Sequence, residues 1–320
     1  MGEEGAPNGT LGPVLLFRMD KAPNSPDSRL TPERSLSTAV LAPSRTFLFL
    51  CDLQKFLSEV LPGEKLESLP VQTAPVSLDT LQSLPPLTLG DSASEPLLLG
   101  LLNSSAPTLF SFPRQLSELQ EHRVELALQP PLLAMLRLRL EEAVAQMVRE
   151  SVGGRDIMDR LLRLQELSVL PREGEDPPAG TQGNPREAQY RALLLLKALQ
   201  TVLGAWEEER GQRAARGGQE GPGKGNVCQL HSLTVSLKKY VLNPPTTNIK
   251  NCQGACSFPL TNTNNHVILL NSHWESGFPL ERPPCCVPVD YEDLQVAELD
   301  GAGTKISIKP NVVAKACGCR

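Results

Sequence analysis

The cysteines of this chain are concentrated at its C-terminal end. Seven of the eight lie between Cys228 and Arg320, whereas residues 1–227 hold only Cys51. Such a cysteine-rich segment is typical of a small domain whose hydrophobic core is too limited to stabilise it and which disulfides hold together. We therefore predict two folding modes, a hydrophobic core before Cys228 and disulfides after it.

Composition and charge argue against several classes of function. The net charge is -5, and residues 214–320 carry ten basic and eight acidic side chains, too small a basic excess for a nucleic-acid partner. No run of 18 apolar residues is present, so membrane insertion is not expected. The sequence shows no Ser/His/Asp set, phosphate-binding loop or paired carboxylates, so neither an enzyme nor a cofactor is expected.

The N-terminal residues conflict with a disulfide-rich C-terminal end. Glu3 and Glu4 stand where a secretion signal would be basic, and the apolar run 13–17 is short for such a signal. Because disulfides form in oxidising compartments, we expect that the true N-terminus of the precursor is missing. Cys51 then has two interpretations, a cysteine whose partner lies in a missing segment or a buried free thiol in a strand-like segment, 45–57.

Two regions of different pattern precede residue 210. Residues 1–125 mix turn clusters with short apolar runs, which predicts a strand-rich region with strands near 14–17, 46–50, 96–102 and 108–112. Residues 131–209 are predicted to be helical because apolar side chains recur there at spacings of three and four. The last helix is expected to start at Pro185, with Asn184 as N-cap and Glu187 in a capping box. The predicted fold of 1–209 is α+β and loop-rich.

Residues 210–227 are predicted to be an exposed processing linker. Six glycines occur within 211–225, a composition that does not bury itself. Two overlapping Arg-x-x-Arg motifs, formed by Arg210, Arg213 and Arg216, fit the acidic subsites of furin-like proteases, which cut extended segments. A solvated basic turn has the same pattern. The position before the cysteine-rich region nevertheless favours precursor cleavage after Arg213 or Arg216.

The cysteine pattern itself leaves one sulfur over. The order is Cys228, C-x3-C, the pair Cys285-Cys286, and C-x-C, and an odd total requires a free thiol or a bond outside the chain. Adjacent residues on a strand point in opposite directions, so one of the pair can face a partner. Zinc, with His231, His266 and His273 as further ligands, is the competing interpretation, but the spacings do not match C-x2-C. A C-x-C redox centre would leave five cysteines without a role.

This spacing resembles that of the cystine-knot growth factors of the transforming growth factor beta superfamily. The resemblance covers residues 228–320 and implies an all-β domain with two antiparallel finger hairpins and one wrist helix. It also implies which cysteines pair. Disulfides Cys252 to Cys317 and Cys256 to Cys319 would close a ring, Cys228 to Cys286 would pass through it, and Cys285 would bond its counterpart in a second chain. Gly254 is expected to be glycine because a side chain in the ring would obstruct the threading disulfide.

Shorter strings place the chain nearer one branch of that superfamily. NCQGAC, NHVILL, RPPCCVP and ACGCR are similar to a branch of gonadal hormones rather than to bone morphogenetic proteins or activins, and LLLLKALQ and LDTLQSLPP are similar to the proregion of that branch. The resemblance implies a secreted homodimer that assembles receptor serine/threonine kinases and drives Smad signalling in gonadal and reproductive-tract development. It also implies a signal peptide and a longer proregion, and hence a truncated precursor.

The resemblance further implies partners and contact residues. The strands of the fingers are expected at 231–239 with 248–251 and at 294–299 with 305–308, and the wrist helix at 266–276. The type II receptor of this branch would meet the convex knuckle, made of Pro244, Leu294, Gln295 and Val296. A bone-morphogenetic-type type I receptor would meet the wrist, at His266, Leu270 and Trp274. Ordinary packing is the alternative for each residue.

Three other features complete the expectations. A furin-like protease would release the mature domain, and the proregion would stay bound to it non-covalently. Sequons at Asn8 and Asn103 would carry glycans in a secreted chain. An alternative function is a cystine-knot antagonist that sequesters related growth factors, although such proteins generally lack a proregion with a processing linker.

Overall fold

The computed structural model describes residues 43–61, 77–90, 95–150, 154–170, 184–217, 227–237, 242–261, 264–278 and 280–320. The helices are α1 (Arg45–Val60), α2 (Glu95–Asn103), α3 (Leu116–Glu121), α4 (Pro130–Arg149), α5 (Arg155–Leu167), α6 (Pro185–Gly217) and α7 (Asn265–Glu275), with a 3-10 turn, η1 (Leu78–Thr80). Among these helices none has both the length and the apolar character needed to span a bilayer.

The strands are mostly short, apart from two long ones near the C-terminus. They are β1 (Leu87–Leu89), β2 (Thr108–Ser111), β3 (Gln229–His231), β4 (Thr234–Ser236), β5 (Leu242–Asn243), β6 (Thr246–Asn248), β7 (Asn251–Gln253), β8 (Cys286–Asp300) and β9 (Gly303–Cys319). The fold is therefore α+β before residue 218 and mostly strand after it.

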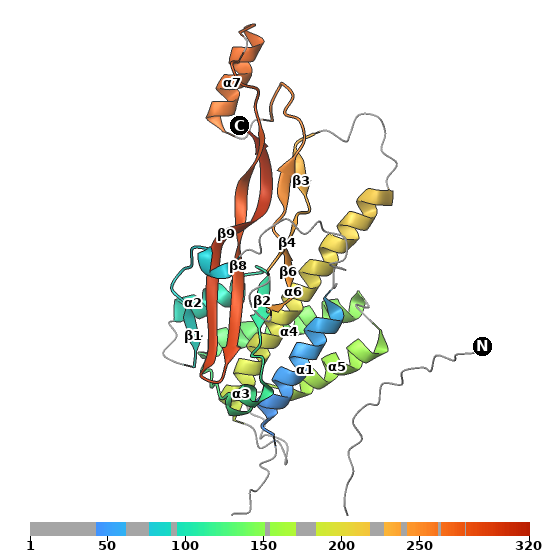
Figure 1. The fold of residues 1–320 in the computed structure, drawn as a ribbon, viewed down its shortest axis with the longest axis vertical. Coiled ribbons are helices and arrows are strands. Elements are labelled where there is room, and N and C mark those ends of the chain that lie inside the picture. Colours follow the sequence, from blue (N-terminus) through green and yellow to red (C-terminus); the bar gives the residue numbers. More distant parts are fainter. Residues whose placement is uncertain are drawn as a thin grey trace, which may run out of the picture. The chain divides into compact units, whose positions relative to one another are not determined.

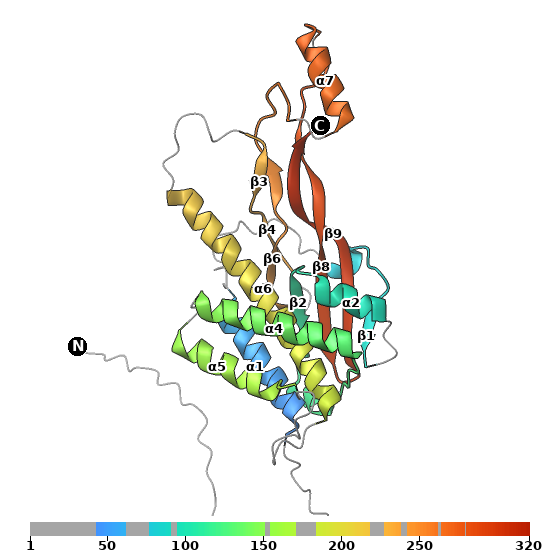
Figure 2. The same ribbon diagram turned by 180° about the vertical axis from the view of Figure 1, so that it is seen from behind.

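The N-terminal region is built around α6. Residues 192–196 of this helix are all at most 1% exposed, so its middle is buried on every side. Figure 2 shows α4 and α5 on one side of α1 and α6. The helices predicted between residues 131 and 170 are confirmed as α4 and α5.

Two of the predicted strands are helices. The segment 45–57 forms α1, whose buried side chains Phe49, Leu53, Phe56 and Val60 recur at helical spacing. The run 96–102 lies in α2, in which Leu98, Leu101 and Leu102 are buried while Leu97 and Leu99 are exposed. In both segments one apolar face packs on the core, and a short apolar run does not show that face clearly in the sequence. The strand predicted at 108–112 is confirmed as β2, and the one at 14–17 lies outside the described residues.

Helix α6 begins at Pro185 as predicted, but the predicted capping box does not form and the helix ends later than expected. Asn184 Oδ1 accepts a hydrogen bond from the Arg186 N–H at 3.1 Å, whereas the Glu187 carboxylate binds Thr46 and Arg191 instead of closing a capping box. The helix continues to Gly217, so the extended linker expected from Arg210 is wrong for residues 210–217. Residues 210–217 contain alanines and arginines, which favour helix. Arg210, the first of these residues, is held by an ion pair with Glu150 that is described below.

The long hairpin of β8 and β9 is paired on both edges by the N-terminal region. The five-stranded sheet has the order β1-β9-β8-β2-β5, with β1 antiparallel to β9 and β2 parallel to β8 (Figure 1). The hairpin predicted at 294–299 with 305–308 is confirmed in register, with Gln295 opposite Ile308 and Glu298 opposite Lys305.

The wrist helix forms where it was expected, and the other predicted finger forms as two short strand pairs that overlap the predicted segments in part; residues 238–239 of that prediction lie outside the described residues. Strand β3 pairs with β7 and β4 with β6, both antiparallel, which places His231 opposite Asn251 and Thr234 opposite Asn248. The wrist helix is α7, and the side chain of Asn264 caps it by accepting from the Val267 N–H at 3.1 Å.

Candidate functional site

Three disulfides form the knot at the base of the fingers. They join Cys228 to Cys286, Cys252 to Cys317 and Cys256 to Cys319, with Cα–Cα distances of 5.4, 5.7 and 5.7 Å. These are the pairs that the family resemblance implies. The knot draws cysteines from β7, β8 and β9 together, so it ties both fingers to one point.

Gly254 is the residue at which the ring admits the third disulfide. Its φ is +123°, and a Cβ there would overlap the carbonyl oxygen of Val227 and lie 2.7 Å from the amide nitrogen of Cys228. Only glycine combines this conformation with that close approach. The obstacle to a side chain is therefore the backbone that enters the ring, whereas the sequence prediction placed it at the threading disulfide.

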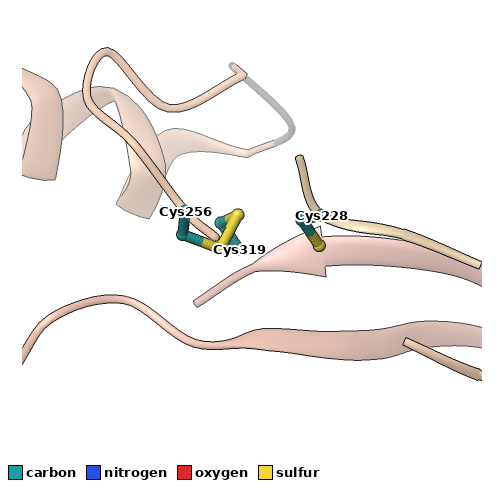
Figure 3. A group of neighbouring side chains, drawn as sticks. All are labelled: Cys228, Cys256 and Cys319. Carbon is teal, nitrogen blue, oxygen red and sulfur yellow. A yellow bond between two sulfur atoms is a disulfide. The ribbon is translucent and has the colours of Figure 1, made fainter. Parts of the chain in front are cut away.

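The sulfur atoms of Cys228, Cys256 and Cys319 gather within 4.8 Å of one another. Figure 3 shows Cys256 and Cys319 joined, with Cys228 beside them. Metal binding by cysteine requires thiolates. Each of these three sulfurs is bonded to another sulfur, so the cluster as it stands offers a metal no thiolate.

Two cysteines among the described residues are free. Cys285 is exposed, and its N–H and C=O pair with the backbone of Arg320 at 2.8 and 3.0 Å, which fixes it beside the knot. Cys51 lies half-buried in α1, where burial raises the pKa of its thiol. Cys285 is thus accessible for a bond to another chain. Cys51 lies in a helix rather than the strand-like segment that was expected, and both interpretations of this thiol stay predictions.

The predicted knuckle residues lie beneath the N-terminal region. Leu294, Gln295 and Val296 are 1–2% exposed, because β2 pairs with this part of β8, and Pro244 is half-buried. In the uncleaved chain, Leu294, Gln295 and Val296 are therefore covered by the N-terminal region. Their role in receptor binding stays a prediction.

Gln295 is bound through both ends of its side-chain amide. Its Oε1 accepts from Thr108 Oγ1 at 3.1 Å, and its Nε2 donates to Ser104 Oγ at 3.0 Å. The backbone carbonyl of Ser104 accepts from Lys197 Nζ at 2.7 Å, and burial lowers the pKa of Lys197 to about 7. The N-terminal region therefore contacts this residue of β8 by side-chain hydrogen bonds as well as by strand pairing.

A second polar contact joins the N-terminal region to the turn between β8 and β9. His122 is fully buried, with Nδ1 2.6 Å from the Asp300 carbonyl oxygen and Nε2 2.8 Å from the Tyr190 hydroxyl. Tyr190 in turn lies 2.6 Å from Thr304 Oγ1. Because a carbonyl oxygen only accepts, Nδ1 carries the proton and Nε2 accepts from Tyr190. Burial lowers the pKa of His122 and raises that of Tyr190. Nothing in the sequence indicated this contact.

The predicted wrist residues share α7. His266 is exposed, Leu270 is half-buried, and Trp274 is 49% exposed while its ring stacks on Phe258 at 4.6 Å between centroids. Two hydrogen bonds of 2.8 Å between Asn271 and the backbone of Leu260 attach the helix to its own loop. The helix also exposes Ile268 and Leu269, so an apolar face is open along it.

The processing and glycosylation candidates are partly described. Arg210 lies in α6 and its Nη2 is 2.7 Å from Glu150 Oε2, and the backbones of Arg213 and Arg216 continue the same helix. Asn103 is exposed at the end of α2, where its Oδ1 accepts from Arg139 Nη2 at 3.2 Å. Asn8 lies outside the described residues.

Comparisons with known proteins match both parts of the chain. Residues 13–210 match the model of the anti-Müllerian hormone N-terminal region, and residues 227–319 match the transforming growth factor beta like domain. Muellerian-inhibiting factor of Sus scrofa is 34% identical over 235 residues, which cover 69% of this chain and 39% of the relative. That of Rattus norvegicus is 41% identical over 136 residues, 41% of this chain and 24% of the relative. Human bone morphogenetic protein 8A is 35% identical over 107 residues, which cover 29% of this chain and 25% of the relative. The chain thus spans well under half of each relative's length.

Proposed function

Because this chain belongs to the anti-Müllerian hormone family of the transforming growth factor beta superfamily, we propose that it is the precursor of a secreted, disulfide-linked dimeric hormone. The observation that carries the proposal is the exposed thiol of Cys285 beside a knot that uses the other six cysteines of its domain. A second copy bonded there would cover the apolar face of α7 and would duplicate each receptor surface.

The hormone acts by bringing receptors together. Its knuckle, at Pro244, Leu294, Gln295 and Val296, binds the anti-Müllerian hormone type II receptor. Its wrist, at His266, Leu270 and Trp274, binds a bone-morphogenetic-type type I receptor. Two copies of each surface on one dimer raise the effective concentration of receptor kinases in the membrane plane. The kinases then drive Smad signalling in gonadal and reproductive-tract development.

Proteolytic processing precedes receptor binding. A furin-like protease cuts after Arg213 or Arg216, and the proregion stays bound non-covalently through β1 and β2. Support comes from the pairing of these strands with β9 and β8, which does not depend on an intact chain at residue 213. Release of β2 exposes the knuckle. Glycans at Asn103 and Asn8 are expected on the secreted proregion.

The function is tested with the processed protein on cells that express the type II receptor and a Smad reporter. Replacing both Gln295 and Val296 with glutamate is expected to abolish receptor binding and the reporter signal. The two side chains leave opposite faces of β8, so the double variant places a negative charge at the contact whichever face meets the receptor. The secreted double variant should still run as a dimer on a non-reducing gel. Unchanged receptor binding would contradict the knuckle assignment.

The alternative function, sequestration of related growth factors, predicts a different result in the same assay. An antagonist would leave the reporter silent and would suppress the signal of an added bone morphogenetic protein. Activation by the wild-type protein alone therefore separates the two functions.

A further inference from the structure

The processing segment is helical in the uncleaved chain. Helix α6 runs to Gly217, so both Arg-x-x-Arg motifs, from Arg210 to Arg216, have helical backbone. In a helix the N–H and C=O groups bond within the segment, whereas a peptide in a binding cleft is extended and offers those groups to its partner. A protease cannot align this segment until the helix end unwinds.

Helix α4 holds one side of this helix end. Arg210 Nη2 lies 2.7 Å from Glu150 Oε2 at the C-cap of α4. Gln146 Nε2 donates to Glu150 Oε1 at 3.0 Å and to Glu207 Oε1 at 3.3 Å. The hydrogen bond from Gln146 is the main cause that lowers the pKa of Glu150, and Arg210 adds to it. The first arginine of the motif therefore already has a carboxylate partner.

The growth-factor region holds the other side. Glu208 Oε1 lies 2.9 Å from Lys250 Nζ, and Glu208 Oε2 accepts from Asn248 Nδ2 at 3.1 Å. Asn248 ends β6, so these contacts join the helix that contains the proposed cleavage site to a finger that follows it in the chain. Residues 207–210 are thus gripped by both parts of the molecule, and we call the contacts of Glu207, Glu208 and Arg210 the clamp.

We infer that the clamp keeps the processing segment helical, and that cleavage requires the clamp to open so that Glu150 releases Arg210 to the protease. The inference rests on the proposed cleavage after Arg213 or Arg216. The Arg-x-x-Arg motifs alone suggest that the protease can cut the precursor freely. The clamp means that the C-terminal end of α6 must first unfold. The ion pairs Arg210–Glu150 and Lys250–Glu208 are both partly exposed. Each therefore stabilises the helical form of the C-terminal end of α6 only modestly relative to its unfolded form.

The rate of cleavage measures the equilibrium between the helical and the unfolded form of the C-terminal end of α6. When winding and unwinding are fast, proteolysis follows the population of the open form. Gly211 offers a way to stabilise the helix, because a Cβ at this position would meet no atom within 4 Å. Alanine has the higher helix propensity, so Gly211→Ala is expected to slow cleavage of the full-length precursor about fivefold.

Two substitutions outside the segment that the protease reads are expected to have the opposite effect. Glu150→Gln removes the charge that holds Arg210, and Lys250→Met removes the partner of Glu208 while it keeps the apolar stem. Each is expected to speed cleavage about twofold, as the loss of a partly exposed ion pair implies. The measurement is the time course of precursor loss with a fixed amount of furin-like protease, followed on a reducing gel.

A synthetic peptide of residues 205–220 is the control for protease preference. With and without Gly211→Ala it should be cut at equal rates, because it lacks α4 and the finger. The inference is overturned if Gly211→Ala slows the peptide as much as the precursor, or if the precursor variants are all cut at the wild-type rate. Arg213→Ala tests the proposed site separately: continued cutting would indicate Arg216 and leave the clamp result to stand by itself.

Discussion

At the scale of single residues, His122 is the side chain whose protonation most directly affects the contact between proregion and finger. Its ring bridges the Asp300 carbonyl and the Tyr190 hydroxyl in a fully buried position. Burial is the main cause that lowers its pKa, and the hydrogen bond to the Asp300 carbonyl and the charge of Asp300 oppose that shift in part. The folded protein therefore favours the neutral ring.

The sign of the pH dependence follows from that direction. Above about pH 6.5 the ring is neutral in both folded and unfolded chains, and the contact contributes fully. As pH falls from about 6.5 toward the lower folded pKa, the unfolded chain binds the proton first and stability is lost. We expect the urea midpoint of the precursor to be lower at pH 5.5 than at pH 7.5, and His122→Phe to reduce that difference. At pH 7.5 the variant should lose about 1–3 kcal/mol, because Asp300 and Tyr190 lose their partner.

His266 provides the matched control, since it is exposed on α7 and makes no comparable buried contact. His266→Phe should keep the wild-type difference between the two pH values. If His122→Phe keeps that difference as well, another group is responsible and the assignment is wrong.

At the scale of elements, the sequence predicted correctly several features that depend on neighbouring residues in the chain, such as a helix cap or the apolar spacing of a helix. The N-cap at Asn184, the leucine spacing of α4 and the strand at Thr108–Ser111 all appear as predicted. Helices α1 and α2 were misread as strands because short apolar runs suit either structure until their packing partner is known. The pairing of β2 with β8 joins segments 187 residues apart, as from Thr108 to Gln295, and no local pattern carries that information.

The candidate site divides along the same line. The pairing of all three disulfides was implied by the family resemblance, which the cysteine spacing carries, and the structure has the same pairs. The burial of Leu294, Gln295 and Val296 could not be predicted in this way. It results from the pairing of β2 with β8, and the family resemblance did not indicate that pairing. The same holds for the network of His122, a residue that follows α3 and whose partners lie in α6, β8 and β9.

The ring of the knot yields a prediction at this scale. Gly254→Ala is expected to prevent the native disulfide pattern, because the added Cβ would overlap the backbone at Val227 and Cys228, which the knot holds in place. Secretion of correctly bonded protein should fall to a small fraction of wild type. Non-reducing gels and mapping of disulfide-linked peptides measure it. Recovery of the three native disulfides at the wild-type level would contradict this account.

Gly277 is a control that distinguishes the two effects of a side chain at Gly254, the steric overlap with neighbouring backbone and the strain of a positive φ. Its φ is +83°, but a Cβ there would meet no atom within 4 Å. Gly277→Ala should therefore cost only about 1 kcal/mol of backbone strain and leave secretion and disulfides nearly unchanged.

At the scale of the whole molecule, the proposed release of the proregion and the proposed dimerisation involve different parts of the chain, the shared sheet and the free thiol of Cys285. Strands β1 and β2 cover the finger hairpin through strand hydrogen bonds and apolar packing, and the three disulfides all lie within residues 228–320, so the proregion could leave after cleavage. Cys285 sits outside the knot with its backbone fixed by Arg320, so a bond formed there does not disturb the fold. Dimerisation and release are thus structurally independent.

That independence predicts the behaviour of Cys285→Ser. Wild-type secreted material should shift from about twice to once the monomer mass on reduction, as a symmetric homodimer requires. The variant should run at the monomer mass without reduction while it keeps all three intrachain disulfides. Cys51→Ser, which removes the half-buried thiol of α1, should still show the wild-type shift. A Cys285→Ser protein that remains covalently dimeric, or a Cys51→Ser protein that does not, would transfer the interchain bond to Cys51 and remove the observation on which the hormone proposal depends.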